Sequence, residues 1–270
     1  MQDLEVRKTY LGTIATPLTS LEWGCFAFID TVDRALRFAR DVESNTMVAA
    51  MQLSGCTRDP RLLIAFKETA SHTHSFIQKA ASAMDALAAF ICAIYSSAFS
   101  TYTDQFVASI NRASSAYAAF QDKLAALLPQ GEHAAESVQA FDKLLQRRLS
   151  GPSLVRAVRR RTVTPVVRFY KRVLLSRPLH RTKLSKLRDT LDEMQWSVFA
   201  TGKLISYLQD EVPDLMNPKG GFTEHLAYKI NTGDWVYLVE LMDLLQGNYL
   251  DVKDAADSLR RMAADLEQVA

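Results

Sequence analysis

The chain has 270 residues, of which 48% are hydrophobic, and a formal net charge of +2. A hydrophobic fraction of this size supplies a core and excludes wholesale disorder. Only 10 glycines and 8 prolines interrupt the sequence, and no run of alternating β-branched residues indicates a strand. The composition therefore predicts an all-α fold, built as one large domain or two small ones.

The first predicted helix covers residues 21–43, where Phe28, Val32 and Leu36 share one apolar side. An amphipathic helix of this kind either inserts into a lipid surface or packs onto the rest of the protein. Three aspartates in the segment weaken its attraction to anionic lipid. Both alternatives stay open from the sequence.

The sequence SGCTRDP at 54–60 predicts a break, with Asp59 as the N-cap and Pro60 as the first residue of the next helix. The second helical segment extends to about residue 128, as one helix or two, and ends at LLPQGEH. Within it, residues 86–103 form an uncharged run of 18, near the lower limit for a membrane span. Because Ser and Thr are frequent in this run, we interpret it as a buried packing face.

The next segment, residues 133–195, contains Pro165 and Pro178. On a helical wheel, a stripe of eight apolar residues falls within an arc of about 80°, with no change of phase at either proline. The stripe consists of Val155, Val158, Val166, Phe169, Val173, Leu184, Leu187 and Leu191. We therefore expect the prolines to bend a continuous helix rather than end it. A last segment runs from about residue 200 to the C-terminus.

Segments of this length would form rods of about 90 Å or more. Rods of this length do not fit into a compact monomer. The pattern therefore predicts an elongated antiparallel bundle of long helices that dimerises along its exposed apolar faces.

Residues 147–188 form a basic block with 14 Lys and Arg and no Asp or Glu. Subtracting 14 from the 32 basic residues leaves 18 against all 30 acidic ones, a balance of −12 elsewhere. Such asymmetry suggests a polyanionic partner, either membrane or nucleic acid, and the alternative is a solvated face paired with the acidic surface of other helices. The residues that we expect to contact anionic lipid are Arg159, Arg160, Arg161, Arg168, Lys171, Arg172, Arg177, Arg181, Lys183, Lys186 and Arg188.

Two motifs in the second half of the chain resemble those of a known family. The stretch Pro165-Val166-Val167-Arg168-Phe169 is followed by Lys183, Lys186 and Asp189. Further on, Glu211-Val212-Pro213-Asp214-Leu215 is followed by Lys219-Gly220-Gly221-Phe222. In this order they are similar to the second- and third-helix motifs of BAR domains of the amphiphysin and yeast reduced-viability-upon-starvation type. The similarity covers about residues 60 to 255.

The resemblance implies a crescent-shaped dimer of kinked three-helix coiled coils. It divides the chain into an N-terminal region, 1–58, and a BAR-like helical domain, 59–270. It also implies a cytoplasmic scaffold, peripheral on anionic phospholipid membranes, that senses or generates curvature in membrane trafficking. The dimer would be a homodimer or a heterodimer with a related BAR protein. The residues at the implied kinks are Pro165, Phe169, Pro213, Gly221 and Phe222.

The sequence offers little for an enzyme or a cofactor. His72 and His74 are two residues apart and lie on different sides of a helix, and no Cys stands at ligand spacing from them. The three cysteines are widely spaced and read as reduced. The sequence NPKGG lacks the length and ending of a phosphate loop. We expect no enzyme activity, no metal and no cofactor.

Two other functions use the same basic face. A helical nucleic-acid-binding protein would place the arginines on phosphates, but the block has few aromatic residues for base stacking, so no nucleic acid is expected. A coiled-coil scaffold would dock an acidic protein there. Trp196 and Phe199, near the implied arm tip, either wedge into lipid or, as we expect, seal the end of the bundle.

Overall fold

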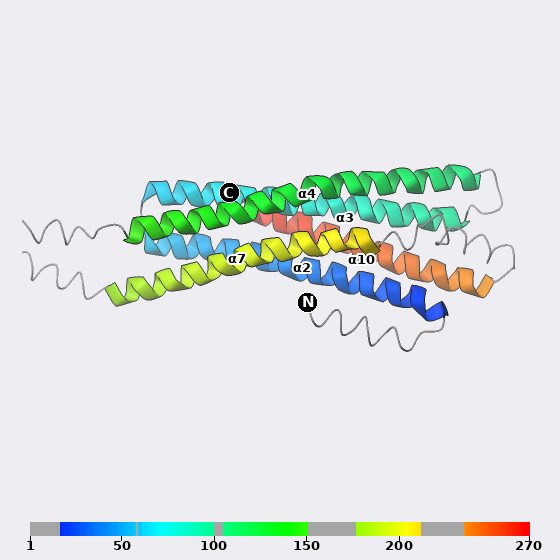
Figure 1. The fold of residues 1–270 in the computed structure, drawn as a ribbon, viewed down its shortest axis with the longest axis horizontal. Coiled ribbons are helices and arrows are strands. Elements are labelled where there is room, and N and C mark those ends of the chain that lie inside the picture. The colour runs from blue at the N-terminus through cyan, green and yellow to red at the C-terminus, as the bar shows by residue number, and fades with distance from the viewer. Residues whose placement is uncertain (1–16, 58, 100–104, 151–176, 212–234) are drawn as a thin grey trace, which may run out of the picture. The chain divides into compact units, whose positions relative to one another are not determined.

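The computed structural model describes residues 17–57, 59–99, 105–150, 177–211 and 235–270. The all-α prediction is confirmed for these residues, which form five helices and no strand (Figure 1). The helices are α2 (Pro17–Cys56), α3 (Pro60–Phe99), α4 (Gln105–Ser150), α7 (Arg177–Glu211) and α10 (Trp235–Glu267).

The predicted break between the first two helices is confirmed. α2 ends at Cys56, and α3 begins at Pro60, where a missing N–H costs no helical hydrogen bond. The N–H of Arg61 donates to Oδ1 of Asp59 at 3.0 Å, as expected for an N-cap. Asp59 and Pro60 therefore predict correctly where α3 begins. α2 extends beyond the predicted 21–43 on both sides.

The predicted end near residue 128 is wrong, because α4 continues through Pro129. The described helices contain 33 to 46 residues. The rods of about 90 Å stay a prediction, because the segments through which α3, α4, α7 and α10 would continue lie outside the described residues. Pro178 lies in the first turn of α7, where proline is tolerated. Pro165, with the other residues of the implied kinks, lies outside the described residues.

In every described helix, buried residues recur at alternating steps of three and four. This repeat of about 3.5 residues is the one used by helices that pack as coiled coils do. In α4 this repeat continues through Pro129 without a change of phase. Buried residues therefore hold the helix both before and after the proline. The α4 series from this region is Leu124, Leu127, Gly131, Ala134, Val138, Phe141 and Leu145.

The chain divides into two compact units, each built from segments that are far apart in the sequence. The predicted domain border at residue 58 falls inside unit 2, between α2 and α3. Unit 1 comprises residues 1–37, 78–128 and 201–260, and unit 2 comprises 38–77, 129–200 and 261–270.

The core of unit 2 combines side chains from α2, α3, α4 and α7. Phe66 and Phe141 pack edge to face, with ring centroids 5.3 Å apart. The hydroxyl of Thr46 donates to the carbonyl of Val42 and lies 3.6 Å from Sδ of Met194. The buried cluster consists of Ala49, Leu53, Leu62, Phe66, Ala70, Val138, Phe141, Leu145, Leu187, Leu191 and Met194.

In unit 1, the later half of α3 packs against α4 and α10. Phe90 is fully buried and contacts the ring of Tyr117 at 5.3 Å between centroids. Asp85 forms an ion pair with Arg260. By length and composition alone, Pro60–Ile94 would pass as a membrane span, and 56% of its most apolar window is buried inside the protein. The packing-face interpretation is confirmed for the described part of this run.

Candidate functional site

The structure describes both ends of the basic block, on α4 and on α7. Seven of its 14 basic residues lie in 151–176, outside the described residues. Arg177 and Arg181 lie in the first two turns of α7. The predicted contact residues outside the described chain are Arg159, Arg160, Arg161, Arg168, Lys171 and Arg172.

In unit 2, the turn of α4 around Asp142 lies beside the turn of α7 around Arg188. Nε of Arg188 donates to Oδ1 of Asp142 at 3.2 Å, and Leu187 and Leu145 belong to one buried cluster. Residues at the two ends of a block more than 40 residues long are thereby brought to the same end of this unit.

The basic side chains at this end differ in whether a protein partner holds them. Arg188 is paired with Asp142, whose side chain is only 15% exposed. Lys183 and Lys186 are exposed, and no ion pair engages either of them within the described residues. These two ammonium groups are therefore open to an external anion.

The first described turn of α7 contains no acidic residue. Lys183 and Lys186 follow it and are exposed. This part of unit 2 is therefore suited to anions.

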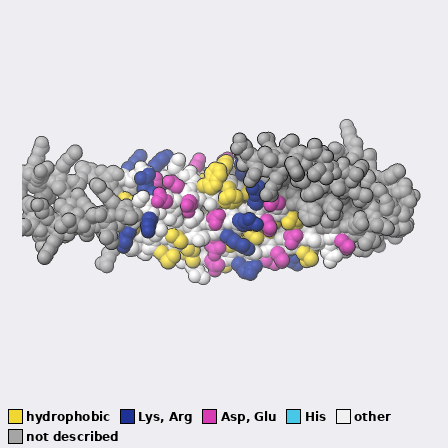
Figure 2. Space-filling model, turned by 90° about the horizontal axis from the view of Figure 1, so that it is seen from below, with side chains coloured by type: hydrophobic (Ala, Val, Ile, Leu, Met, Phe, Trp, Pro, Cys, Tyr) yellow, Lys and Arg dark blue, Asp and Glu magenta, His cyan; other side chains and the backbone are white. Residues whose placement is uncertain are grey.

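The positive surface does not continue along α7. Asp189, Asp192 and Glu193 follow the block directly, and all three are exposed. Figure 2 shows Lys and Arg at one end of the described surface and again near its middle, with acidic side chains interspersed among them. Any anionic partner that relies on charge must therefore contact the end of the unit rather than the length of the helix.

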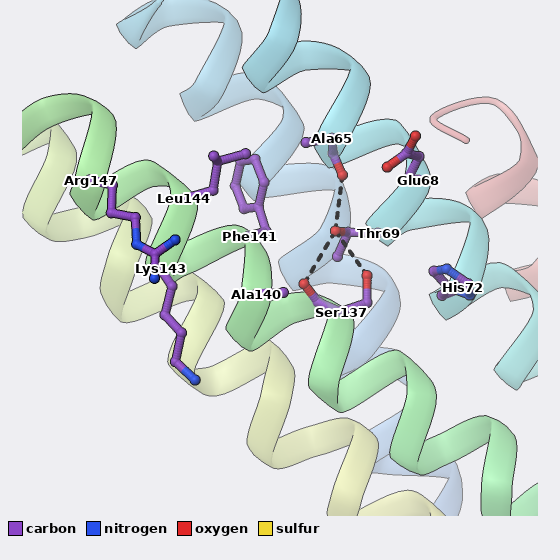
Figure 3. Close-up of a pocket in the computed structure, with 10 residues that line it drawn as sticks. All are labelled: Ala65, Glu68, Thr69, His72, Ser137, Ala140, Phe141, Lys143, Leu144 and Arg147. Carbon is purple, nitrogen blue, oxygen red and sulfur yellow. Dashed lines mark hydrogen bonds between the residues drawn. The ribbon is translucent and has the colours of Figure 1, made fainter.

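A groove of about 440 Å³ lies between α3 and α4 in unit 2 (Figure 3). On its floor, Oγ of Ser137 donates to Oγ1 of Thr69 at 3.1 Å, and Thr69 donates to the carbonyl of Ala65 at 3.0 Å. Both hydroxyl protons are thus used within the protein. The rim mixes charges of both signs, including Glu68 and Arg147. The groove is best explained as a close crossing of two helices over small residues.

The predicted membrane-insertion residues lie on the face of α2 that packs inward. Phe28 and Val32 are buried, with 5% and 2% exposed, and Leu36 is half-buried. Phe28 and Val32 occupy successive positions of the buried series in α2. Insertion would require their removal from the core, so the packing alternative describes this structure.

The expectation that Trp196 and Phe199 seal the end of the bundle is wrong. Their side chains are exposed, at 61% and 53%, and contact each other on the surface of α7. The sequence contained a signal for this position. Val198 and Thr201 follow the buried series of α7, which leaves Trp196 and Phe199 out of phase with it.

Glu43 of α2 and Asp265 of α10 bring two carboxyl groups together in unit 2. Burial raises the pKa of Glu43 above its ordinary value, the charge of Asp265 and a side-chain hydrogen bond to it raise that pKa further, and Arg40 opposes the shift. The free energy of unfolding should therefore depend on pH through this pair.

Within the described residues, no group of three or more His, Cys, Asp or Glu side chains is placed to hold a metal ion. Cys56 and Cys92 are free thiols.

Comparisons of the chain with protein-family models, with curated proteins and with solved structures find no match. The resemblance to BAR domains therefore rests on the motifs around Pro165 and Pro213 and stays a prediction.

Proposed function

We propose that this protein is a helical scaffold that binds anionic membrane surfaces as a dimer and senses or generates their curvature. The observation that carries the proposal is the basic block, in which 14 Lys and Arg occur with no acidic residue. The exposed ammonium groups of Lys183 and Lys186 support it, as does the absence of an acidic residue from the first described turn of α7.

The attraction would be electrostatic. Near an anionic leaflet, each Lys or Arg contributes about 1 kcal/mol. Several acting together give stable binding that weakens as salt screens the charges. Arg188 would contribute less than the two lysines, because Asp142 already neutralises it.

Curvature requires a stiff protein as well as adhesion. The membrane bends to match a scaffold when the adhesion energy exceeds the cost of bending. The continuous buried series along each described helix supports the stiffness. The kinked three-helix arrangement and the crescent-shaped dimer belong to the same proposal, and the motifs at Pro165 and Pro213 support them.

Flotation of the full chain with anionic and with neutral vesicles, at low and high salt, tests the membrane interaction. We expect binding to anionic vesicles alone, weakened by salt. The double variant Lys183→Glu/Lys186→Glu should reduce the affinity for anionic vesicles about tenfold or more. The matched control Lys67→Glu/Lys123→Glu changes the net charge equally at exposed positions outside the block and should have a much smaller effect.

Binding that is equal for neutral and anionic vesicles, or equal for the two double variants, would contradict the proposal. An RNA of similar charge serves as competitor. Tighter binding to the RNA than to vesicles at the same salt would replace the membrane with a nucleic acid. Where vesicles bind, electron microscopy for tubules then tests curvature.

A further inference from the structure

The outward face of α7 carries the exposed aromatic pair Trp196 and Phe199. Their ring centroids are 6.0 Å apart and their planes are inclined by 34°. Figure 2 shows hydrophobic side chains exposed among charged ones on the face that it displays. Removing the apolar surface of these two rings from water would be favourable. The basic block does not account for it, since acidic residues precede it on the helix.

Two charges of opposite sign lie at equal distances along the helix from the aromatic pair. Asp192 lies four residues before Trp196, and Lys203 lies four residues after Phe199. At 100° per residue, these four side chains fall within an arc of about 60°, so they form one stripe along the helix. Asp192 and Lys203 are both exposed. The stripe therefore reads negative, aromatic, aromatic, positive.

A stripe of this kind is complementary to itself when it is reversed. In a two-fold symmetric contact, the same surface meets itself in the opposite direction. Placing the two-fold axis midway between Trp196 and Phe199 stacks each aromatic residue on the other type in the second copy. The same register brings Asp192 of each copy to Lys203 of the other. A lipid surface offers no such match, because Asp192 and Glu193 would face anionic head groups.

We propose that residues 192–203 of α7 pair antiparallel with the same residues of a second copy of this chain. The inference rests on the dimer that is part of the proposed function, and it identifies the contact surface. The aromatic pair forms the centre, and the charged residues fix register and direction.

The aromatic pair by itself is smaller than a stable dimer interface. An aromatic side chain buries about 150–250 Å² when fully covered, and roughly half of each ring is exposed here, so the pair supplies about 200 Å² per copy. Stable interfaces bury about 800 Å² per partner. The pair therefore acts as a hot spot, and neighbouring surface on α7 contributes the remaining area.

Sedimentation velocity of the full chain without lipid, over a range of concentrations, tests the proposal. We expect a reversible dimer of the wild-type chain. Trp196→Ala/Phe199→Ala should raise the dimer Kd about 30-fold, as for a hot spot of 2 kcal/mol. The control Ile64→Ala, at another exposed apolar side chain of unit 2, should leave the Kd unchanged. Circular dichroism verifies that each variant keeps its helices.

Charge reversal tests the register. Asp192→Lys alone and Lys203→Glu alone each place like charges together twice in the dimer and should raise the Kd about tenfold. The double variant Asp192→Lys/Lys203→Glu restores opposite charges at both contacts and should return the Kd to within about threefold of wild type.

Three results would overturn the proposal. The first is a wild-type chain that stays monomeric at every concentration, and the second is an unchanged Kd in the double alanine variant. The third is a double charge reversal that associates no better than the single variants. Flotation of the same variants keeps the two proposals apart. A dimer-deficient chain that still binds anionic vesicles in a salt-sensitive way leaves the membrane proposal standing.

Discussion

Phe141 on α4 and Phe199 on α7 are the same residue type in long helices, but Phe141 is 2% exposed and Phe199 is 53% exposed. Phe141 occupies the buried series of its helix and meets Phe66 across unit 2. Phe199 follows Val198, which is fully buried, and so lies one residue out of phase. The difference shows that phase within the repeat decides burial here, whereas residue type does not. It also separates positions that hold the fold from positions on the surface.

The largest effect should come from the same substitution at the two phenylalanines. Phe141→Ala leaves a cavity in the unit 2 core and should lower the free energy of unfolding by about 3–5 kcal/mol. Phe199→Ala removes a mostly hydrated ring and should change it by less than about 1 kcal/mol. Urea unfolding followed by circular dichroism measures both. Similar losses at the two sites would break the comparison.

Two glycines, one packed against a buried ring and one in open space, test the same comparison between packed and exposed positions. The expected changes in the free energy of unfolding are smaller. In a helix interior, Gly→Ala normally stabilises by up to about 1 kcal/mol. At Gly131 the new Cβ would lie 3.0 Å from Cε2 of Phe76, which is fully buried. Overpacking typically costs about 1–3 kcal/mol, so Gly131→Ala should destabilise by about 1 kcal/mol.

Gly247 provides the matched control, because no atom would lie within 4 Å of its new Cβ. Gly247→Ala should stabilise by about 0.5–1 kcal/mol. Thermal and urea unfolding of both variants would show opposite signs. A stabilised Gly131→Ala would mean that the α3–α4 contact in unit 2 is looser than the structure shows.

The smallest effect concerns the half-buried Glu43. Burial and Asp265 raise its pKa in the folded chain, so the folded state holds this proton more tightly than the unfolded state. No penalty exists below the ordinary pKa of a glutamate. Stability is then lost as the pH rises through the raised pKa, and the loss stays constant above it.

Glu43→Gln removes this penalty and should make the chain more stable than wild type at neutral pH. The gain should be smaller than the effects above, because water screens a half-buried group. Urea unfolding at acidic and at neutral pH measures it. The difference between variant and wild type should vanish at acidic pH. A gain that persists there would point to packing rather than to charge.

Local signals in the sequence predicted some borders and not others. Asp59 and Pro60 act within one turn, so their effect is readable without knowing what packs nearby. Pro129 is also a local signal, but the buried series on both sides of it outweighs its effect. The phase test applied to residues 155–191 would have predicted this continuation if it had been applied to residues 113–145.

The candidate site was predictable only in part. The basic block is a property of composition, so the sequence contains it in full. That Arg188 is paired with Asp142, while Lys183 and Lys186 face outward, depends on the neighbouring helix. Amphipathic pattern alone does not distinguish a face that inserts into lipid from one that packs on protein, as Phe28 and Val32 show.

The sequence by itself determined that the chain is helical, where α2 gives way to α3, and that positive charge is concentrated in one block. These properties follow from composition and from interactions within a single turn. Only the tertiary structure decided that Phe28 and Val32 pack on protein, and that Arg188 is paired with Asp142 while Lys183 and Lys186 face outward. The physical reason is that burial depends on which surface another helix presents, and that surface comes from residues far away in the chain.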